Sequence, residues 1–347
     1  MSMSNLQMGL LVLGVVVLAV MAVHAAWTSR KNLPRQAMPD APPTEHHHRG
    51  AGIEPELDAA AFDVADFPLP VLEKKPALDS LIDVIAPITL EAAISGEAVL
   101  ASMPSTRRAG SKPFAIEGLN EASKQWEMPQ TGQRYSTCQA GVQLANRSGA
   151  LNDIEFSEFV VKTQEFCDGI NGTPDFPDMR EEVARARELD QFAGDHDAQL
   201  GFVLRARHAA WSPGYVQQNA SRLGFVAGAI PGRMVVQASA AGLPPVLGLS
   251  FDAQAAQADD PALSAIREVS LSLDVAQVDR SERAFERMRE AALSLASTMD
   301  GVVTDHNGTL LPPEALDVIG AELEQLYDTL DRRDLSAGSA LARRLFS

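Results

Sequence analysis

Cysteine and basic residues are scarce in this chain, and each scarcity argues against a class of protein. The 347 residues contain only two cysteines, Cys138 and Cys167, which are too few for a secreted disulfide framework and fit a reducing cytoplasm. We expect both to be small buried side chains in strands. Lys and Arg number 29 against 46 Asp and Glu, a formal net charge of −17. Because phosphate binding requires clustered basic side chains, we expect no nucleic acid partner.

The sequence also lacks the common catalytic motifs. It contains no Walker-type glycine loop, Gly-x-Ser-x-Gly elbow, His-Glu-x-x-His or Cys-x-x-Cys motif. The best acid/base candidates are the pairs Asp195-His196 and Asp305-His306. The short sequences around them, rich in Asp, Asn and Gly, are more typical of turns. We interpret the three histidines at 46–48 as solvated rather than as metal ligands. We therefore predict no enzyme, and we assign no catalytic, cofactor-binding or metal-binding residue.

Charge is absent from Met8–Trp27, the longest apolar run of the chain. About 20 apolar residues in a helix cover the roughly 30 Å of hydrocarbon in a bilayer. We predict one transmembrane anchor within residues 1–30. Its membrane residues include Leu10, Leu13, Val16, Val20 and Trp27.

A cleaved signal peptide is the alternative to an anchor, and the distribution of charge disfavours it. Signal peptides normally carry positive charge before their apolar core, whereas Met1–Gln7 has none. Arg30, Lys31 and Arg35 follow the apolar run instead. The positive-inside rule then places the N-terminus in the periplasm and the bulk of the chain in the cytoplasm, as a single-pass inner-membrane protein.

Residues 31–77 are predicted to be an acidic, proline-containing linker. The stretch from 32 to 76 holds eight prolines with acidic residues between them, and it has too little apolar surface to offset the entropy of ordering. At about 3.1 Å per residue, an extended linker would hold a folded head on the order of 100 Å from the membrane.

After residue 78 the chain turns globular and contains a diverged internal repeat. Met179-Arg180-Glu181 and Met288-Arg289-Glu290 each open a helical run, and a similar series of elements precedes each. We predict β-α-β-β-β-α twice, an α+β fold with helices on one face of an antiparallel sheet. The first copy has strands at 81–90, 113–119, 135–144 and 156–166 and a helix at 95–103. The second has strands at 199–205, 233–238, 245–251 and 269–275 and a helix at 213–223.

Alternation assigns the faces of the second sheet. Phe202 and Leu204 lie on one side of their strand, while Gly201 and Val203 lie on the other. The helical stripe that includes Leu295 is expected to cover one face. Replacement of Leu293 or Leu295 is expected to lower stability.

Several local sequences resemble the ZipA family of bacterial division proteins. The membrane segment with its basic exit, His24–Lys31, is similar to that of the family. So are Arg222–Gly228 and Leu295–Pro313, within a stretch from about residue 199 to 330. The order of anchor, proline-containing tether and C-terminal domain also agrees. The boundaries are therefore an additional α+β module at 78–195, a ZipA-like domain at 196–332 and a C-terminal tail at 333–347.

The resemblance implies a six-stranded antiparallel sheet whose bare face binds the C-terminal peptide of FtsZ through apolar contacts. Carried onto this sequence, the peptide-binding residues are Val203, Val235, Val246 and Ser272. A charge at Val203 or Val246 is then expected to weaken tail binding without unfolding the domain. The chain departs from the family in the module at 78–195, in the polar residues Ser270, Ser272 and Asp274, and in Gly201 and Gly248.

The resemblance further implies a function in cell division. The expected protein is a non-enzymatic, septum-forming component that tethers the FtsZ ring to the inner membrane, with the FtsZ tail and membrane lipid as partners and no cofactor. A membrane-anchored cell-envelope enzyme that uses the Asp/His turns is the alternative. A regulator that senses a signal through the first module is a third interpretation.

Overall fold

The computed structural model describes residues 34–37, 78–258, 260 and 263–347. The predicted anchor, the histidines at 46–48 and most of the predicted linker lie outside these residues. Within the described part of the chain, no helix combines the length and the apolar character needed to cross a bilayer. The chain divides into two compact units, and each is built from several separate segments.

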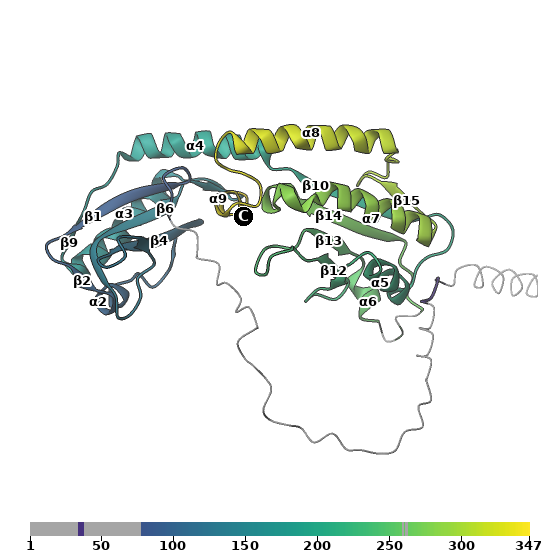
Figure 1. Ribbon diagram of the computed structural model, residues 1–347, viewed down its shortest axis with the longest axis horizontal. Coiled ribbons are helices and arrows are strands. Elements are labelled where there is room, and N and C mark those ends of the chain that lie inside the picture. Colours follow the sequence, from purple (N-terminus) through teal and green to yellow (C-terminus); the bar gives the residue numbers. More distant parts are fainter. Residues whose placement is uncertain (1–33, 38–77, 259, 261–262) are drawn as a thin grey trace, which may run out of the picture. The chain divides into compact units, whose positions relative to one another are not determined.

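Unit 2 combines residues 78–200 with Asp274–Ala284 and Asp317–Ser347. Its main sheet is antiparallel, in the order β3-β4-β6-β1-β9 (Figure 1). The strands are β1 (Asp83–Leu90), β2 (Ile94–Ser95), β3 (Arg108–Ala109), β4 (Lys112–Asn120), β5 (Trp126–Glu127), β6 (Arg134–Gln143), β7 (Ala145–Asn146), β8 (Gly149–Ala150) and β9 (Gly172–Pro174). The helices are α2 (Gly96–Ala101), α3 (Asp153–Ile170), α4 (Met179–His196), the short 3-10 turns Val275–Gln277 and Arg280–Glu282, and α9 (Ala340–Leu345).

Unit 1 combines residues 34–37 with Gly201–Leu273 and Phe285–Leu316. Its six-stranded sheet has the order β11-β12-β13-β14-β10-β15 (Figure 1). The strands are β10 (Gln199–Ala206), β11 (Val226–Ala227), β12 (Arg233–Val236), β13 (Leu247–Ser250), β14 (Glu268–Asp274) and β15 (Gly301–Thr304). The helices are α5 (Pro213–Ser221), α6 (Ala253–Ala256), α7 (Ala284–Met299) and α8 (Pro313–Asp331), whose residues from Asp317 onward group with unit 2.

The two units share one order of elements. When the short elements β2, β5, β7, β8, β11 and α6 are left out, each runs strand, helix, three strands, helix, strand, helix. The sheet orders β3-β4-β6-β1-β9 and β12-β13-β14-β10-β15 then correspond strand for strand. Each second helix ends at a left-handed residue, Asn171 (φ 52°) after α3 and Asp300 (φ 58°) after α7. A glycine follows each, Gly172 or Gly301, and begins the next strand. This correspondence supports a duplicated fold.

The predicted register of the repeat was wrong. Residues 156–166, predicted as a strand, belong to helix α3, so α4 corresponds to α8 and not to α7. Asn152 and Glu155 form a reciprocal capping box at the start of α3, and Phe159 contacts Phe114 of β4, with ring centroids 6.0 Å apart. The β-branched residues inside α3 favoured a strand locally, but the amphipathic helix fits the covered face of the sheet.

Cys138 lies in β6, as expected, but Cys167 lies in α3 rather than in a strand. Both are buried and free. Burial raises the pKa of the Cys138 thiol to about 12 and that of Cys167 to about 11. The interpretation as small buried side chains is therefore confirmed, and both thiols remain protonated at neutral pH.

The C-terminal residues 333–347, predicted as a tail, are a folded part of unit 2. Leu345 and Phe346 are fully buried, and the Gln277 side chain donates to the backbone carbonyls of Arg343 and Phe346. Six residues of helix are too few for a periodic pattern to show in the sequence. The predicted boundaries 78–195 and 196–332 also differ from the structure, because 274–284 and 317–331 complete unit 2.

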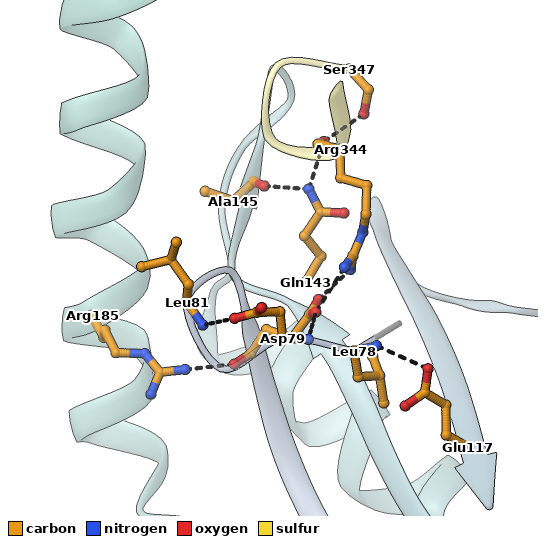
Figure 2. Close-up of polar contacts among 10 residues, drawn as sticks. Leu78, Asp79, Leu81, Glu117, Gln143, Ala145, Arg185, Arg344 and Ser347 are labelled. Atoms are coloured by element: carbon orange, nitrogen blue, oxygen red, sulfur yellow. Dashed lines mark hydrogen bonds and ion pairs between the residues drawn. The ribbon is translucent and has the colours of Figure 1, made fainter. Parts of the chain in front are cut away.

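The side chain of Arg344 closes unit 2 by pairing with the fully buried Asp83. Its guanidinium bonds both carboxylate oxygens, with Nη1 2.9 Å from Oδ2. The Asp79 N–H donates to the same carboxylate, and Gln143 Nε2 donates to the carbonyls of Arg344 and Ala145 at 2.8 and 2.7 Å (Figure 2). The last residues of the chain are thus bonded to its first described strand.

Burial raises the pKa of Asp83 above its ordinary value of 3.8, and the hydrogen bond and charge of Arg344 oppose this rise without cancelling it. The cost of removing the carboxylate from water is therefore only partly offset by its partner. Such a pair contributes little net stability as a whole, but the loss of one member leaves an uncompensated buried charge.

We predict that Arg344→Met destabilises the protein by about 3–5 kcal/mol at neutral pH, whereas the double variant D83N/R344M recovers most of the loss. The pKa of Asp83 is raised in the folded state. Its contribution to the free energy of unfolding is therefore fully present below its unfolded pKa and is lost as the pH rises through the folded pKa. The deficit of R344M should therefore shrink as the pH is lowered toward about 4. Urea unfolding of the three proteins measures it. A stable R344M at neutral pH would contradict the role assigned to the pair.

Helix α7 provides a matched test of the covered face. Leu295 is 1% exposed, while Leu293 is 41% exposed, so the expectation of a stability loss applies to Leu295 and not to Leu293. Leu295→Ala should lower the free energy of unfolding by about 2–5 kcal/mol. Leu293→Ala should stay within about 0.5 kcal/mol of the parent protein. Equal effects in denaturant unfolding would show that α7 packs differently.

Residues 34–37, expected to belong to the free linker, are attached to unit 1. The Arg35 N–H donates to the Ala210 carbonyl at 2.7 Å, and the Ser212 N–H donates to the Arg35 carbonyl at 2.8 Å. Arg35 thereby forms a parallel bridge with Trp211, and Pro34 is buried. This part of the predicted linker belongs to a folded unit.

Candidate functional site

The sheet of unit 1 has one covered face and one open face. Met234, Leu249 and Leu271 are partners on neighbouring strands and are all buried. On the same side Phe202 contacts Phe285 of α7, with ring centroids 6.4 Å apart. Because side chains alternate along a strand, the residues between these positions lie on the opposite face.

A row of small and apolar residues crosses four strands of the open face. Val226 of β11 pairs with Val235 of β12, Val235 pairs with Gly248 of β13, and Gly248 pairs with Ser272 of β14. Val226 is 44% exposed, Ser272 is exposed, and Val235 and Gly248 are half-buried. We call these four residues the open row.

Gly248 and Ser272 shape the middle of the open row. A Cβ placed on Gly248 would come within 2.5 Å of the Ser272 hydroxyl oxygen, so the serine hydroxyl occupies the space that the glycine leaves. The glycine and the serine therefore act together. The row presents valine side chains at one end and a hydroxyl at the other.

His306 covers the open face at Gly201 of β10. A Cβ placed on Gly201 would lie 2.1 Å from His306 Nε2, so the imidazole occupies the space that the glycine leaves. Beside it, Arg205 forms an ion pair with Glu268 of β14, with Nη1 3.3 Å from Oε1. These polar groups border the apolar part of the face.

The structure divides the predicted peptide-binding residues into two groups. Val235 and Ser272 belong to the open row. Val203 and Val246 are only 5% and 1% exposed, so their side chains offer almost no surface to a partner. The family resemblance placed all four on one face but did not show what covers two of them. Their role in peptide binding stays a prediction.

Val226 and His306 were not predicted as peptide-binding residues. β11 is only two residues long and gives no alternation pattern. For His306, the signal was a glycine at an open-face position of β10, which leaves room for a side chain from elsewhere in the chain.

The Asp/His turns do not form an acid/base site within the described contacts. Asp305 accepts a hydrogen bond from the Thr309 N–H at 2.7 Å, and Gly308 has φ 87°, which is turn geometry. His196 Nδ1 contacts the Phe192 carbonyl at 2.7 Å. Asp195 and His196 belong to unit 2, whereas Asp305 and His306 belong to unit 1. No group of metal-binding side chains is present among the described residues.

In unit 2 the chain itself covers one end of the corresponding sheet face. Leu78 lies over Gly141, where an added Cβ would come within 2.5 Å of Leu78 Cδ2. The Leu78 N–H donates to Glu117 Oε1 at 2.9 Å (Figure 2), and Gln139 donates to Glu117 Oε2 at the same distance. This end of the face is therefore unlike the open row of unit 1.

An apolar cavity of about 260 Å³ lies beside Leu78 in unit 2, at the outer edge of β4. Met103, Pro104, Pro113 and Met128 are among its lining residues, with Arg107 beside them. It is large enough for one or two apolar side chains. It is a second candidate for a binding site, separate from the open row.

The contrast between buried and open valines predicts different responses to charge. Val203→Glu and Val246→Glu would bury an unpaired carboxylate and should each lower the free energy of unfolding by more than about 3 kcal/mol. The earlier expectation that these changes leave the domain folded does not fit their burial. Val226→Glu and Val235→Glu should cost less than about 1 kcal/mol. Thermal unfolding of the four variants measures it, and a severe loss in V226E would contradict the open face.

Comparison with known families concerns unit 1 most directly. Residues 257–322 match the family model described as ZipA, C-terminal FtsZ-binding domain. This match spans β14, α7, β15 and the start of α8. It confirms the resemblance to the ZipA family noted in the sequence. No curated protein matches the chain.

Proposed function

We propose that the protein is a non-enzymatic cell-division component that tethers FtsZ to the inner membrane through the FtsZ C-terminal tail. Binding of FtsZ is what the matched family does. The open row of unit 1 carries the proposal, because it joins Val226, Val235 and Gly248 into an accessible surface on the unit that holds most of the matched residues.

The chemistry of the open row suits an apolar peptide. An exposed sheet face offers apolar contact area without requiring new backbone hydrogen bonds, and a few large side chains of the peptide then supply most of the affinity. The hydroxyl of Ser272 and the pair of Arg205 with Glu268 offer polar contacts at the border of the row. The affinity need not be high, because a polymer presents many tails to many membrane-bound receptors.

Membrane attachment is proposed from the sequence. Met8–Trp27 has no charged side chain, and Arg30 and Lys31 follow it. A single span in this orientation leaves the N-terminus in the periplasm and both folded units in the cytoplasm. Anchoring confines the receptor to a surface and raises the effective concentration of its partner there.

A titration of the full-length protein in detergent micelles with a peptide of the FtsZ C-terminal tail tests the site. We expect Val235→Glu to weaken binding at least about tenfold, since the charge would be desolvated by an apolar side chain of the peptide. Thr89→Glu, an exposed strand residue of unit 2, is the matched control and should leave binding unchanged. Unchanged affinity in V235E would remove the open row from the site.

A further inference from the structure

The position of Arg35 bears on how far unit 1 can stand from the membrane. Arg35 is held by two backbone hydrogen bonds, to Ala210 and from Ser212. Its side chain adds an ion pair, with Nη2 2.9 Å from Asp300 Oδ2. The partners flank α5 and α7 of unit 1, so the segment 34–37 is bound to the unit at separate points.

Asp300 is arranged to receive the arginine. It caps α7 in a left-handed conformation, and its carboxylate also contacts His208 Nδ1 at 3.0 Å. The bond to His208 and the charges of His208 and Arg35 lower the pKa of Asp300. The carboxylate is therefore ionised at neutral pH, as a partner for a guanidinium requires.

We propose that the docked segment 34–37 keeps unit 1 close to the membrane surface, so that residues 38–77 link unit 1 to unit 2 and do not set the distance of unit 1 from the membrane. The inference rests on the proposed anchor. Trp27 and Arg35 are eight residues apart, which an extended chain spans in about 26–29 Å. That is far less than the reach on the order of 100 Å expected for the whole linker.

The docking has a direct covalent test. A Cβ placed on Gly214 of α5 would lie 3.8 Å from Ala37 Cβ, which is the usual separation in a disulfide. The full-length variant A37C/G214C should therefore form this disulfide readily under mild oxidation. Cys138 and Cys167 do not interfere, because they are buried and remain protonated.

Two variants control the cross-link. In A37C/S221C the second cysteine lies about 10 Å further along α5, so it should cross-link several-fold less. Arg35→Pro removes both the N–H that bonds Ala210 and the guanidinium that bonds Asp300, and it should lower the yield of A37C/G214C several-fold. His208→Ala keeps the arginine contacts and should not. Equal yields for G214C and S221C would overturn the docking.

The height of unit 1 is tested with vesicles. The full-length S221C variant, labelled with a fluorescent donor, is reconstituted with acceptor-labelled lipid. A Gly/Ser insertion of about twenty residues after Asn32 lengthens the chain before the docked segment, by a root-mean-square distance on the order of 25 Å, and should reduce energy transfer several-fold. The same insertion after Ala60 should leave transfer unchanged.

The outcomes separate this inference from the proposed function. Equal losses of transfer from both insertions would show that the whole linker sets the height and would overturn the proposal. A protein that fails to associate with vesicles would overturn the proposed anchor, and the height with it. The disulfide would still report whether the segment docks on unit 1.

Discussion

Each sheet of this protein has two faces, and its helices cover only one of them. The second face must be covered by another part of the chain or remain available to a partner. In unit 2 the chain covers one end of it, with Leu78 over Gly141 and Arg344 paired with Asp83. In unit 1 the open row keeps its valines accessible. The two copies thus differ in which part of this face the chain itself covers, and the face of unit 1 is the candidate receptor.

The sequence predicted the strands and helices of unit 1 better than it predicted which of their side chains are buried. Alternation in β10, β13 and β14 assigned the faces, because a strand with one apolar side shows a period of two. The burial of Val203 and Val246 depends on residues distant in sequence, which no local pattern reports. Two of the four predicted site residues, Val235 and Ser272, lie on the open row.

The errors in unit 2 have different physical causes. Helix α3 combines β-branched residues with phenylalanines, and only its packing on the sheet decides between helix and strand. The C-terminal segment is short, and its burial depends on the pairing of Arg344 with Asp83, 261 positions earlier in the chain. The prediction of a free linker was wrong at Arg35, because its backbone hydrogen bonds with Ala210 and Ser212 do not depend on the pattern of side chains in the sequence.

The division of unit 2 into three segments has a consequence for biosynthesis. A ribosome releases the N-terminal part of a chain first, and domains usually fold in that order. Here the buried Leu345 and Phe346 are made only after every segment of unit 1. The carboxylate of Asp83 must wait for its counter-ion until a further 261 residues have been made. The earlier unit is therefore completed only after the later one has been synthesised, and a chain truncated before Arg344 would leave an incomplete core.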